Sequence, residues 1–220
     1  MISVAIDGPA GAGKSSISRI VSKRLGFIYV DTGALYRTVA LYLLEKGIDA
    51  ADAAAVEAAL GGIKVDLRFI EGEQHMFLNE KDVTNLIRTP EVSMMASKSS
   101  ALGAVRAYLL NCQRELAERY NVIMDGRDIG TVVLPNAQIK IFLTADPEER
   151  ARRRYAELIE KGIEADYDTV LAEIIERDYN DSHRPIAPLK PAENSILVNT
   201  TGYNFEESCD LLMNTIKERL

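Results

Sequence analysis

The chain has 220 residues, of which 47% are hydrophobic and 27% charged, and its formal net charge is -7. This size fits one core domain with a small insertion, and the composition allows a substantial buried core. The acidic balance disfavours general nucleic-acid binding, and no apolar run approaches the roughly 20 residues that a membrane span needs. Cys112 and Cys209 lack metal-ligand spacing, and the chain opens on a strand pattern rather than a signal segment. We therefore expect a cytoplasmic protein with no membrane partner.

Strand and helix patterns alternate along the chain. Continuous apolar runs predict five strands buried on both faces, at residues 3–7, 27–30, 122–125, 139–143 and 196–199. Helical periodicity predicts the intervening helices, at residues 14–25, 35–46, 50–62, 102–120, 148–161, 167–180 and 206–219. This alternation predicts an α/β fold, with a parallel five-stranded sheet flanked by helices.

Residues 63–84 break this rhythm. Two short β-rich runs, residues 65–69 and 76–78, flank the turn signal Glu71-Gly72-Glu73. The segment predicts a small antiparallel subdomain inserted into the core domain. Near the other end of the chain, the three prolines in residues 184–191 predict an irregular connection before the last strand.

The segment Gly8-Pro9-Ala10-Gly11-Ala12-Gly13-Lys14-Ser15 matches the phosphate-loop pattern G-x-x-x-x-G-K-[ST] in full. It follows a strand and opens a helix, which is the context that the motif requires. Backbone N–H groups at such a helix N-terminus bind phosphate oxygens. Lys14 is expected to reach the β- and γ-phosphates of a nucleotide, and the Ser15 hydroxyl to bind Mg²⁺.

Further polar residues follow the ends of two other strands. Thr32 and Arg37 come after the second strand, and Arg127 and Asp128 after the third. Ligands bind beyond the carboxyl ends of parallel strands, so these side chains are expected near the phosphate loop. The alternative for Arg127 and Asp128 is a surface ion pair.

Arginines also flank a helix–loop–helix segment near residue 160. Arg150, Arg152, Arg153 and Arg154 begin one helix, and Arg177 and Arg184 lie at the end of the next. We expect this segment to be a cationic lid whose arginines repel one another until a nucleotide binds. The alternative is a set of solvated salt bridges, for example between Arg177 and Asp181 at i, i+4 spacing.

Several motifs together resemble the bacterial cytidylate kinases, the CMP and dCMP kinases. They are IDGPAGAGKS at 6–15, DTGALYR at 31–37, IRTPEV at 87–92, DGRDIGTVVLP at 125–135, ERD at 176–178 and RPIAPL at 184–189. The resemblance runs in order along nearly the whole chain. It implies a P-loop nucleoside monophosphate kinase fold for residues 1–220, with a monophosphate-binding insert at 63–100 and a lid at 150–165. It further implies transfer of the ATP γ-phosphate to CMP or dCMP in pyrimidine nucleotide metabolism, by a monomer with no nucleic-acid partner.

The resemblance also implies roles for individual residues. ATP would bind to Gly8 through Ser16 and to Arg153, with Ser15 at the metal. Catalysis would rest on Lys14, Arg127, Arg153 and Arg184, which offset charge during an in-line transfer without a covalent intermediate. Cytosine would be read by Ser97, Arg106 and Asp128, because these groups complement its N4 donor and its N3 and O2 acceptors. The remaining CMP contacts would be the phosphate clamps Arg37, Arg127 and Arg184, the sugar contacts Arg177 and Asp181, and Thr32 and Tyr36.

The chain departs little from the pattern of this family. Ser15-Ser16 stands where some members carry Gly-Thr, and Thr32 where some carry Ser; each keeps a hydroxyl. Tyr36 would either contact the phosphate or only pack. Two rival functions stay open: a kinase for another small acceptor such as UMP, AMP or shikimate, and a nucleotide-dependent switch without an acceptor. The GTPase base-reading motif and the transporter ATPase signature do not occur in the chain.

Overall fold

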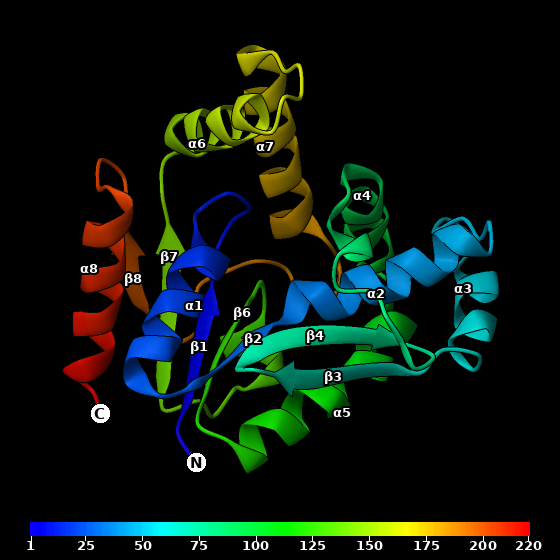
Figure 1. The fold of residues 1–220 in the computed structure, drawn as a ribbon, viewed down its shortest axis with the longest axis horizontal. Helices are drawn as coiled ribbons and strands as arrows, with labels where there is room; N and C mark the ends of the chain where they lie inside the picture. The colour runs from blue at the N-terminus through cyan, green and yellow to red at the C-terminus, as the bar shows by residue number, and fades with distance from the viewer. The chain divides into compact units, whose positions relative to one another are not determined.

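The main sheet of the computed structural model, which describes residues 1–220, has five strands in the order β2-β6-β1-β7-β8 (Figure 1). They are β1 (Ser3–Asp7), β2 (Ile28–Asp31), β6 (Val122–Gly126), β7 (Ile139–Thr144) and β8 (Ile196–Asn199). β1 pairs in parallel with β6 and β7, and β8 pairs in parallel with β7. The predicted parallel five-stranded sheet is confirmed. The register sets Asp7 beside Gly126, so β1 and β6 end at the same edge.

The chain forms two compact units, and the first comprises Met1–Tyr29 and Tyr120–Leu220. Its helices are α1 (Lys14–Leu25), the π-helix η2 (Ile129–Val133), α6 (Pro147–Glu160), α7 (Tyr167–His183) and α8 (Phe205–Lys217). In Figure 1, α1 and α8 lie side by side, and their apolar residues share one core with those of β1, β6 and β7. The members of this core include Ile6, Ile17, Ile141 and Leu212, so these two helices cover one face of the sheet.

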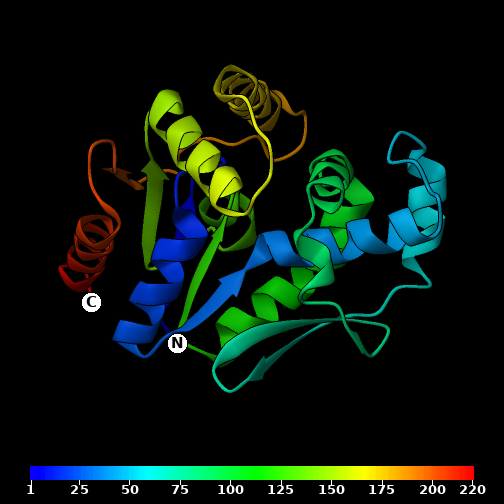
Figure 2. The same cartoon turned by 45° about the horizontal axis from the view of Figure 1, so that its top comes forward.

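α6 and α7 form a helical pair in the same unit. Figure 2 shows them side by side, and Ala151, Val170 and Ile174 are the buried residues of the small apolar cluster between them. Asp166 caps α7 by accepting a hydrogen bond from the Thr169 N–H, which fixes where this helix begins.

The second compact unit, Val30–Arg119, holds the predicted antiparallel strands. β3 (Val65–Ile70), β4 (Glu73–Leu78) and β5 (Lys81–Asp82) form one sheet, and β3 pairs antiparallel with β4 across the turn at Glu71 and Gly72. The predicted β-rich segment is therefore confirmed. The unit also contains α2 (Thr32–Glu45), α3 (Ala53–Leu60), η1 (Leu86–Arg88), α4 (Pro90–Ser99) and α5 (Gly103–Arg119). The predicted insert, residues 63–100, lies inside this larger unit, and its role as a substrate-binding subdomain stays a prediction.

Helices α2 and α4 differ from the sequence-based expectation, and α3 and α7 differ from their predicted bounds by two or three residues at an end. α2 begins at Thr32 rather than at residue 35, because the Asp31 carboxylate caps it by accepting from the Ala34 N–H. α4 was not predicted, although Thr89 accepts from the Val92 N–H and Pro90 occupies its first turn. No helix of the structure has the length and apolar character needed to span a membrane.

Candidate active site

The phosphate loop connects β1 to α1, as the sequence predicted. Gly8 has φ +152°, and a Cβ atom there would lie 1.9 Å from the Leu143 carbonyl oxygen, so only glycine fits at this position. Gly13 is the N-cap of α1 in the left-handed region, and no side chain caps the helix or places a carboxylate in its first turn. No carboxylate of α1 itself therefore offsets the positive end of the helix dipole; the nearby Asp125, which accepts from the Ser15 hydroxyl, belongs to β6.

Lys14 is buried, and its ammonium donates a 2.7 Å hydrogen bond to the Pro9 carbonyl across the loop. Burial lowers the pKa of Lys14, and the nearby Arg127 lowers it further, whereas Asp125, Asp181 and Asp7 oppose the shift. An anion bound beside a buried amine stabilises its protonated, charged form. The contact of Lys14 with a phosphate stays a prediction.

Two carboxylates support the loop from the ends of β1 and β6. Asp125 accepts hydrogen bonds from the Ser15 hydroxyl at 2.9 Å and from the Tyr29 hydroxyl at 2.8 Å. Asp7 accepts from the backbone N–H groups of Ile129 and Gly130 at 2.6 and 2.8 Å. Burial raises the pKa of Asp7 to about 6, although these two hydrogen bonds oppose the shift. Asp7 thereby ties the strand that precedes the loop to η2, the segment that follows Asp128.

No role for Asp7 or Asp125 was predicted from the sequence. Each is the polar end of an otherwise apolar strand, which is the signal that could have found them. The sequence did not give the strand order, and only the pairing of β1 with β6 brings the two strand ends together.

The predicted residues after β6 form ion pairs with α7 and its C-cap. Arg127 Nε donates to the Asp181 carboxylate at 2.7 Å, and Arg184 Nη2 lies 3.7 Å from Asp128 Oδ1. Asp128 is only 4% exposed, so the alternative of a surface Arg127–Asp128 pair is wrong. Burial raises the pKa of Asp181, but Arg127, followed by Arg177 and Arg184, more than offsets this and brings it below the ordinary value.

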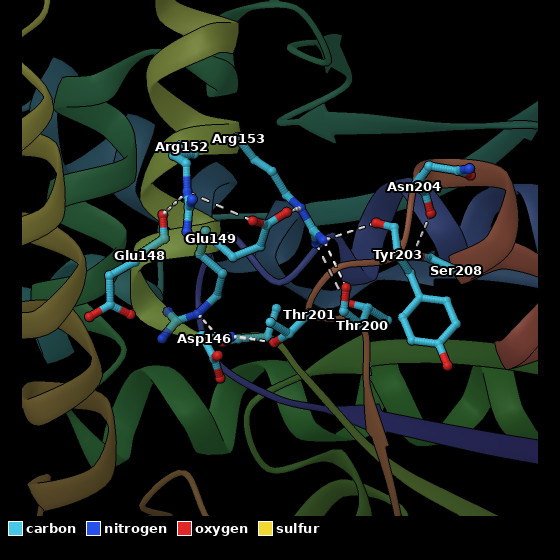
Figure 3. Close-up of polar contacts among 12 residues, drawn as sticks. Asp146, Glu148, Glu149, Arg152, Arg153, Thr200, Thr201, Tyr203, Asn204 and Ser208 are labelled. Atoms are coloured by element: carbon cyan, nitrogen blue, oxygen red, sulfur yellow. Dashed lines mark hydrogen bonds and ion pairs between the residues drawn. The ribbon is translucent and has the colours of Figure 1, made fainter.

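The arginines of α6 have partners of their own, contrary to the expected cluster of self-repelling cations. Arg150 is buried and pairs with Asp178. In Figure 3, the Arg153 guanidinium points toward the loop between β8 and α8, where it donates to the carbonyls of Thr200 and Tyr203 at 2.9 and 3.3 Å. Glu149 pairs with Arg153 at i, i+4 spacing, and Glu157 pairs with Arg154 at i, i+3 spacing. These carboxylates offset the mutual repulsion of the arginines without a nucleotide. The contact of Arg153 with ATP stays a prediction.

The predicted CMP contacts that belong to the second unit lie on α2, α4 and α5. Arg37 pairs with Asp31 at 2.8 Å, so its guanidinium is already oriented by a carboxylate. Arg106 donates to the Ser100 carbonyl, and its guanidinium carbon lies 5.7 Å from the centre of the Tyr36 ring. Tyr36 thus packs on a predicted base reader. Thr32 is buried at the start of α2, and Ser97 is half-buried on α4.

Solved structures similar to this chain show the same fold at low sequence identity. A gluconokinase from Sinorhizobium meliloti matches with a TM-score of 0.51 and 13% identity, covering 99% of this chain and 92% of its own. An uncharacterized protein from Eubacterium ventriosum matches with a TM-score of 0.56 and 12% identity over the whole of both chains. At these identities the likeness concerns the fold alone.

Relatives found by sequence share a much higher identity with this chain than these solved structures do. The sequence profile described as "Cytidylate kinase" matches residues 4–218. A cytidylate kinase from Carboxydothermus hydrogenoformans is 51% identical, over 97% of this chain and 96% of its own. Another, from Caldicellulosiruptor bescii, is 50% identical over 94% of this chain and 91% of its own. On this full-length match, the chain belongs to the cytidylate kinase family.

Proposed function

We propose that the protein transfers the γ-phosphate of ATP to CMP or dCMP, giving ADP and CDP or dCDP. The observation that carries this proposal is the match of nearly the whole chain to the cytidylate kinase family, including relatives near 50% identity. The intact phosphate loop, with Lys14 buried at its end, supports the donor half of the reaction. The predicted acceptor residues Asp128 and Arg106 support the other half, since both are largely buried and charged.

The phosphate loop would hold the triphosphate of ATP. Backbone N–H groups of residues 8–16 and the N-terminus of α1 would face its oxygens, and Lys14 would neutralise charge on the β- and γ-phosphates. Arg153 would add to this if it exchanged the Thr200 and Tyr203 carbonyls for a phosphate. Because the acceptor oxygen of CMP is already ionised near neutral pH, the reaction needs positioning and charge stabilisation more than a strong base.

The acceptor CMP would be held by charged side chains that contact its phosphate and its sugar. Arg37, Arg127 and Arg184 would clamp the CMP phosphate, since guanidinium groups bind phosphate bidentately. The ion pairs of Arg127 with Asp181 and of Arg184 with Asp128 keep two of these guanidinium groups oriented. Arg177 and Asp181 would contact the sugar.

Base selection would rest on Asp128, Ser97 and Arg106. An ionised Asp128 only accepts hydrogen bonds, which suits the N4 amino group of cytosine and opposes the O4 of uracil. Because Asp128 is buried, leaving it against an oxygen would be costly, and this supports discrimination against UMP.

Mg²⁺ would be held with ATP at the Ser15 hydroxyl and the Asp125 carboxylate. The two groups are 2.9 Å apart, and Mg²⁺ in kinases prefers such oxygen ligands together with substrate phosphates. The ion would supply charge neutralisation of the phosphates. Asp125 extends the predicted metal set, which contained Ser15 alone.

We also propose a monomer in the cytoplasm. Both cysteines are free thiols, which is compatible with a reducing compartment. Light scattering of the purified protein checks the monomer, with a mass of 24.3 kDa expected.

A panel of acceptors tests the activity. CMP, dCMP, UMP, AMP and shikimate are each incubated with ATP and Mg²⁺, and the products are identified by chromatography. We expect diphosphates from CMP and dCMP far ahead of UMP and AMP, and no turnover after chelation of Mg²⁺. Equal rates with AMP would contradict the cytosine assignment, and ATP hydrolysis that does not depend on CMP would favour a nucleotide switch.

A further inference from the structure

Arg150 joins three parts of the first unit through a buried guanidinium whose side chain is only 3% exposed. Nε donates to the Ala145 carbonyl just after β7, at 2.8 Å. Nη1 donates to the Ala10 carbonyl of the phosphate loop at 2.9 Å, and Nη1 and Nη2 form a fork on Asp178 at 3.1 and 2.5 Å. A single side chain of α6 therefore contacts the segment that follows β7, the phosphate loop and α7.

The phosphate loop also packs against these helices. A Cβ atom on Gly11 would lie 3.4 Å from Arg150 Cβ and 3.9 Å from Ile174 Cδ1, and Gly11 has φ +73°. The C=O of residue 10 and the N–H of residue 11 belong to one planar trans peptide and point in opposite directions. Because Arg150 holds the Ala10 carbonyl on the side of α6, it also directs the Gly11 N–H to the other side of the loop.

Asp178 makes this arrangement possible. An arginine stays charged when buried, so its desolvation must be offset by a partner with good geometry. Asp178 supplies that partner as a fork on two nitrogens, and it is itself half-buried on α7. The same helix carries Asp181, which pairs with Arg127.

We propose that Arg150 and Asp178 form a positioning pair that sets the phosphate loop for nucleotide binding. By holding the Ala10 carbonyl, the pair fixes the orientation of the peptide between Ala10 and Gly11, so that the Gly11 N–H is available to a phosphate oxygen. Through Asp178, it links the shape of the loop to α7. Neither residue touches the nucleotide in this role, which rests on the proposed use of ATP as donor.

The test compares Arg150→Lys and Asp178→Asn with the control Arg152→Met. Arg152 lies on the same helix with its side chain 65% exposed, and its contacts are with Glu148 and Glu149 (Figure 3). Titration calorimetry with Mg²⁺ and no CMP measures Kd for ATP and for inorganic tripolyphosphate. We expect both test variants to weaken the binding of the two ligands by the same factor, about tenfold. Arg150→Lys loses the guanidinium that holds the Ala10 carbonyl, and Asp178→Asn loses the charged partner that orients Arg150. KM for CMP at saturating ATP should change much less, and the control should match the wild type.

A double variant, Arg150→Met with Asp178→Leu, separates positioning from stability and serves if the single variants do not fold. Apolar replacement of a buried ion pair often preserves stability. We expect the double variant to melt near the wild type and still bind tripolyphosphate about tenfold more weakly, since the Ala10 carbonyl has lost its donor. Wild-type affinity for tripolyphosphate in the folded single or double variants would overturn the proposal. Failure of the proposed function is distinguishable, because it would be seen as inactivity of the wild type in the acceptor panel.

Discussion

The two compact units of the chain differ in where they keep their charged side chains. The first unit buries six of them: Asp7, Lys14, Asp125, Asp128, Arg150 and Asp181. The second buries only Asp31 and Arg106. Its largest ion-pair network lies at the start of β3 and just before β5 and is open to solvent; it is formed by Lys64, Asp66, Arg68 and Glu80. Buried charges are costly unless they are paired, so a concentration of them points to chemistry more than to stability.

The pKa shifts of the two units reflect the same contrast. In the first unit, burial raises the pKa of Asp7 to about 6. In the second, hydrogen bonds from Lys64 and Arg68 lower the pKa of Glu80 to about 2, yet Glu80 is exposed to solvent. Solvent and salt screen such a surface pair, so its large shift translates into little stability.

The largest expected effect is on catalysis, from Lys14→Met. Loss of the buried ammonium should lower kcat/KM for CMP phosphorylation about a thousandfold, the scale for removing one charge-stabilising group. The melting temperature should not fall, because the variant no longer buries an amine. Lys23→Met, an exposed change in the same helix, should leave both measurements unaltered. Near-normal turnover in the Lys14 variant would break the link between buried charge and chemistry.

Asp7 should make the stability depend on pH. Its pKa is higher in the folded protein than the ordinary 3.8, so its stabilising contribution is complete below about pH 4 and is lost as the pH rises through about 6. The loss amounts to about 2–3 kcal/mol of unfolding free energy, since a shift of one unit corresponds to about 1.4 kcal/mol.

Urea unfolding at several pH values between 4 and 7.5 measures this contribution. Asp7→Asn should flatten the decline, whatever its effect at any single pH, whereas the exposed control Asp210→Asn should keep the wild-type profile. A decline that persists unchanged in Asp7→Asn would show that Asp7 is not the group responsible.

Asp128→Asn should change the choice of base. An amide can rotate to offer a donor to O4 of uracil, whereas CMP loses a hydrogen bond to a charged acceptor, at a cost of about 1–3 kcal/mol. The ratio of kcat/KM for CMP over UMP should therefore shrink about tenfold. Asp181→Asn is the matched control, because its partner Arg127 is proposed to contact the phosphate that both substrates share. If the ratio stays constant in Asp128→Asn, this residue orients Arg184 and does not read the base.

The smallest effect is expected from the exposed network of the second unit. Glu80→Gln removes the negative charge that pairs with Lys64 and Arg68, and Arg68 keeps its second partner Asp66. We expect no measurable change in melting temperature at high salt, and an unaltered kcat/KM for CMP, because solvent already screens these charges. A clear loss of stability would mean that the two units do not differ in how they use charge.

Local features that a short segment encodes could be predicted from the sequence alone. The phosphate loop was predicted in full, because its glycines, its lysine and the flanking strand and helix are all adjacent in the chain. The bounds of β1, α1 and β8 agree with the predicted ranges, because each has an unbroken apolar or helical pattern. The start of α2 was predicted too late, and α4 was not predicted, although Asp31 and Thr89 carried readable cap signals.

Which charged side chains meet could not be predicted, because their pairing depends on how distant elements pack together. Arg150 and Asp178 are 28 residues apart, and Arg127 and Asp181 are 54 apart, so no helical or strand spacing links either pair. The arginines of α6 looked alike in sequence, yet packing made Arg150 a buried partner of the phosphate loop and left Arg152 in solvent. The physical reason is that desolvation and ion pairing depend on distances between elements far apart in the chain, and these are fixed only when the sheet order and the helix packing are complete.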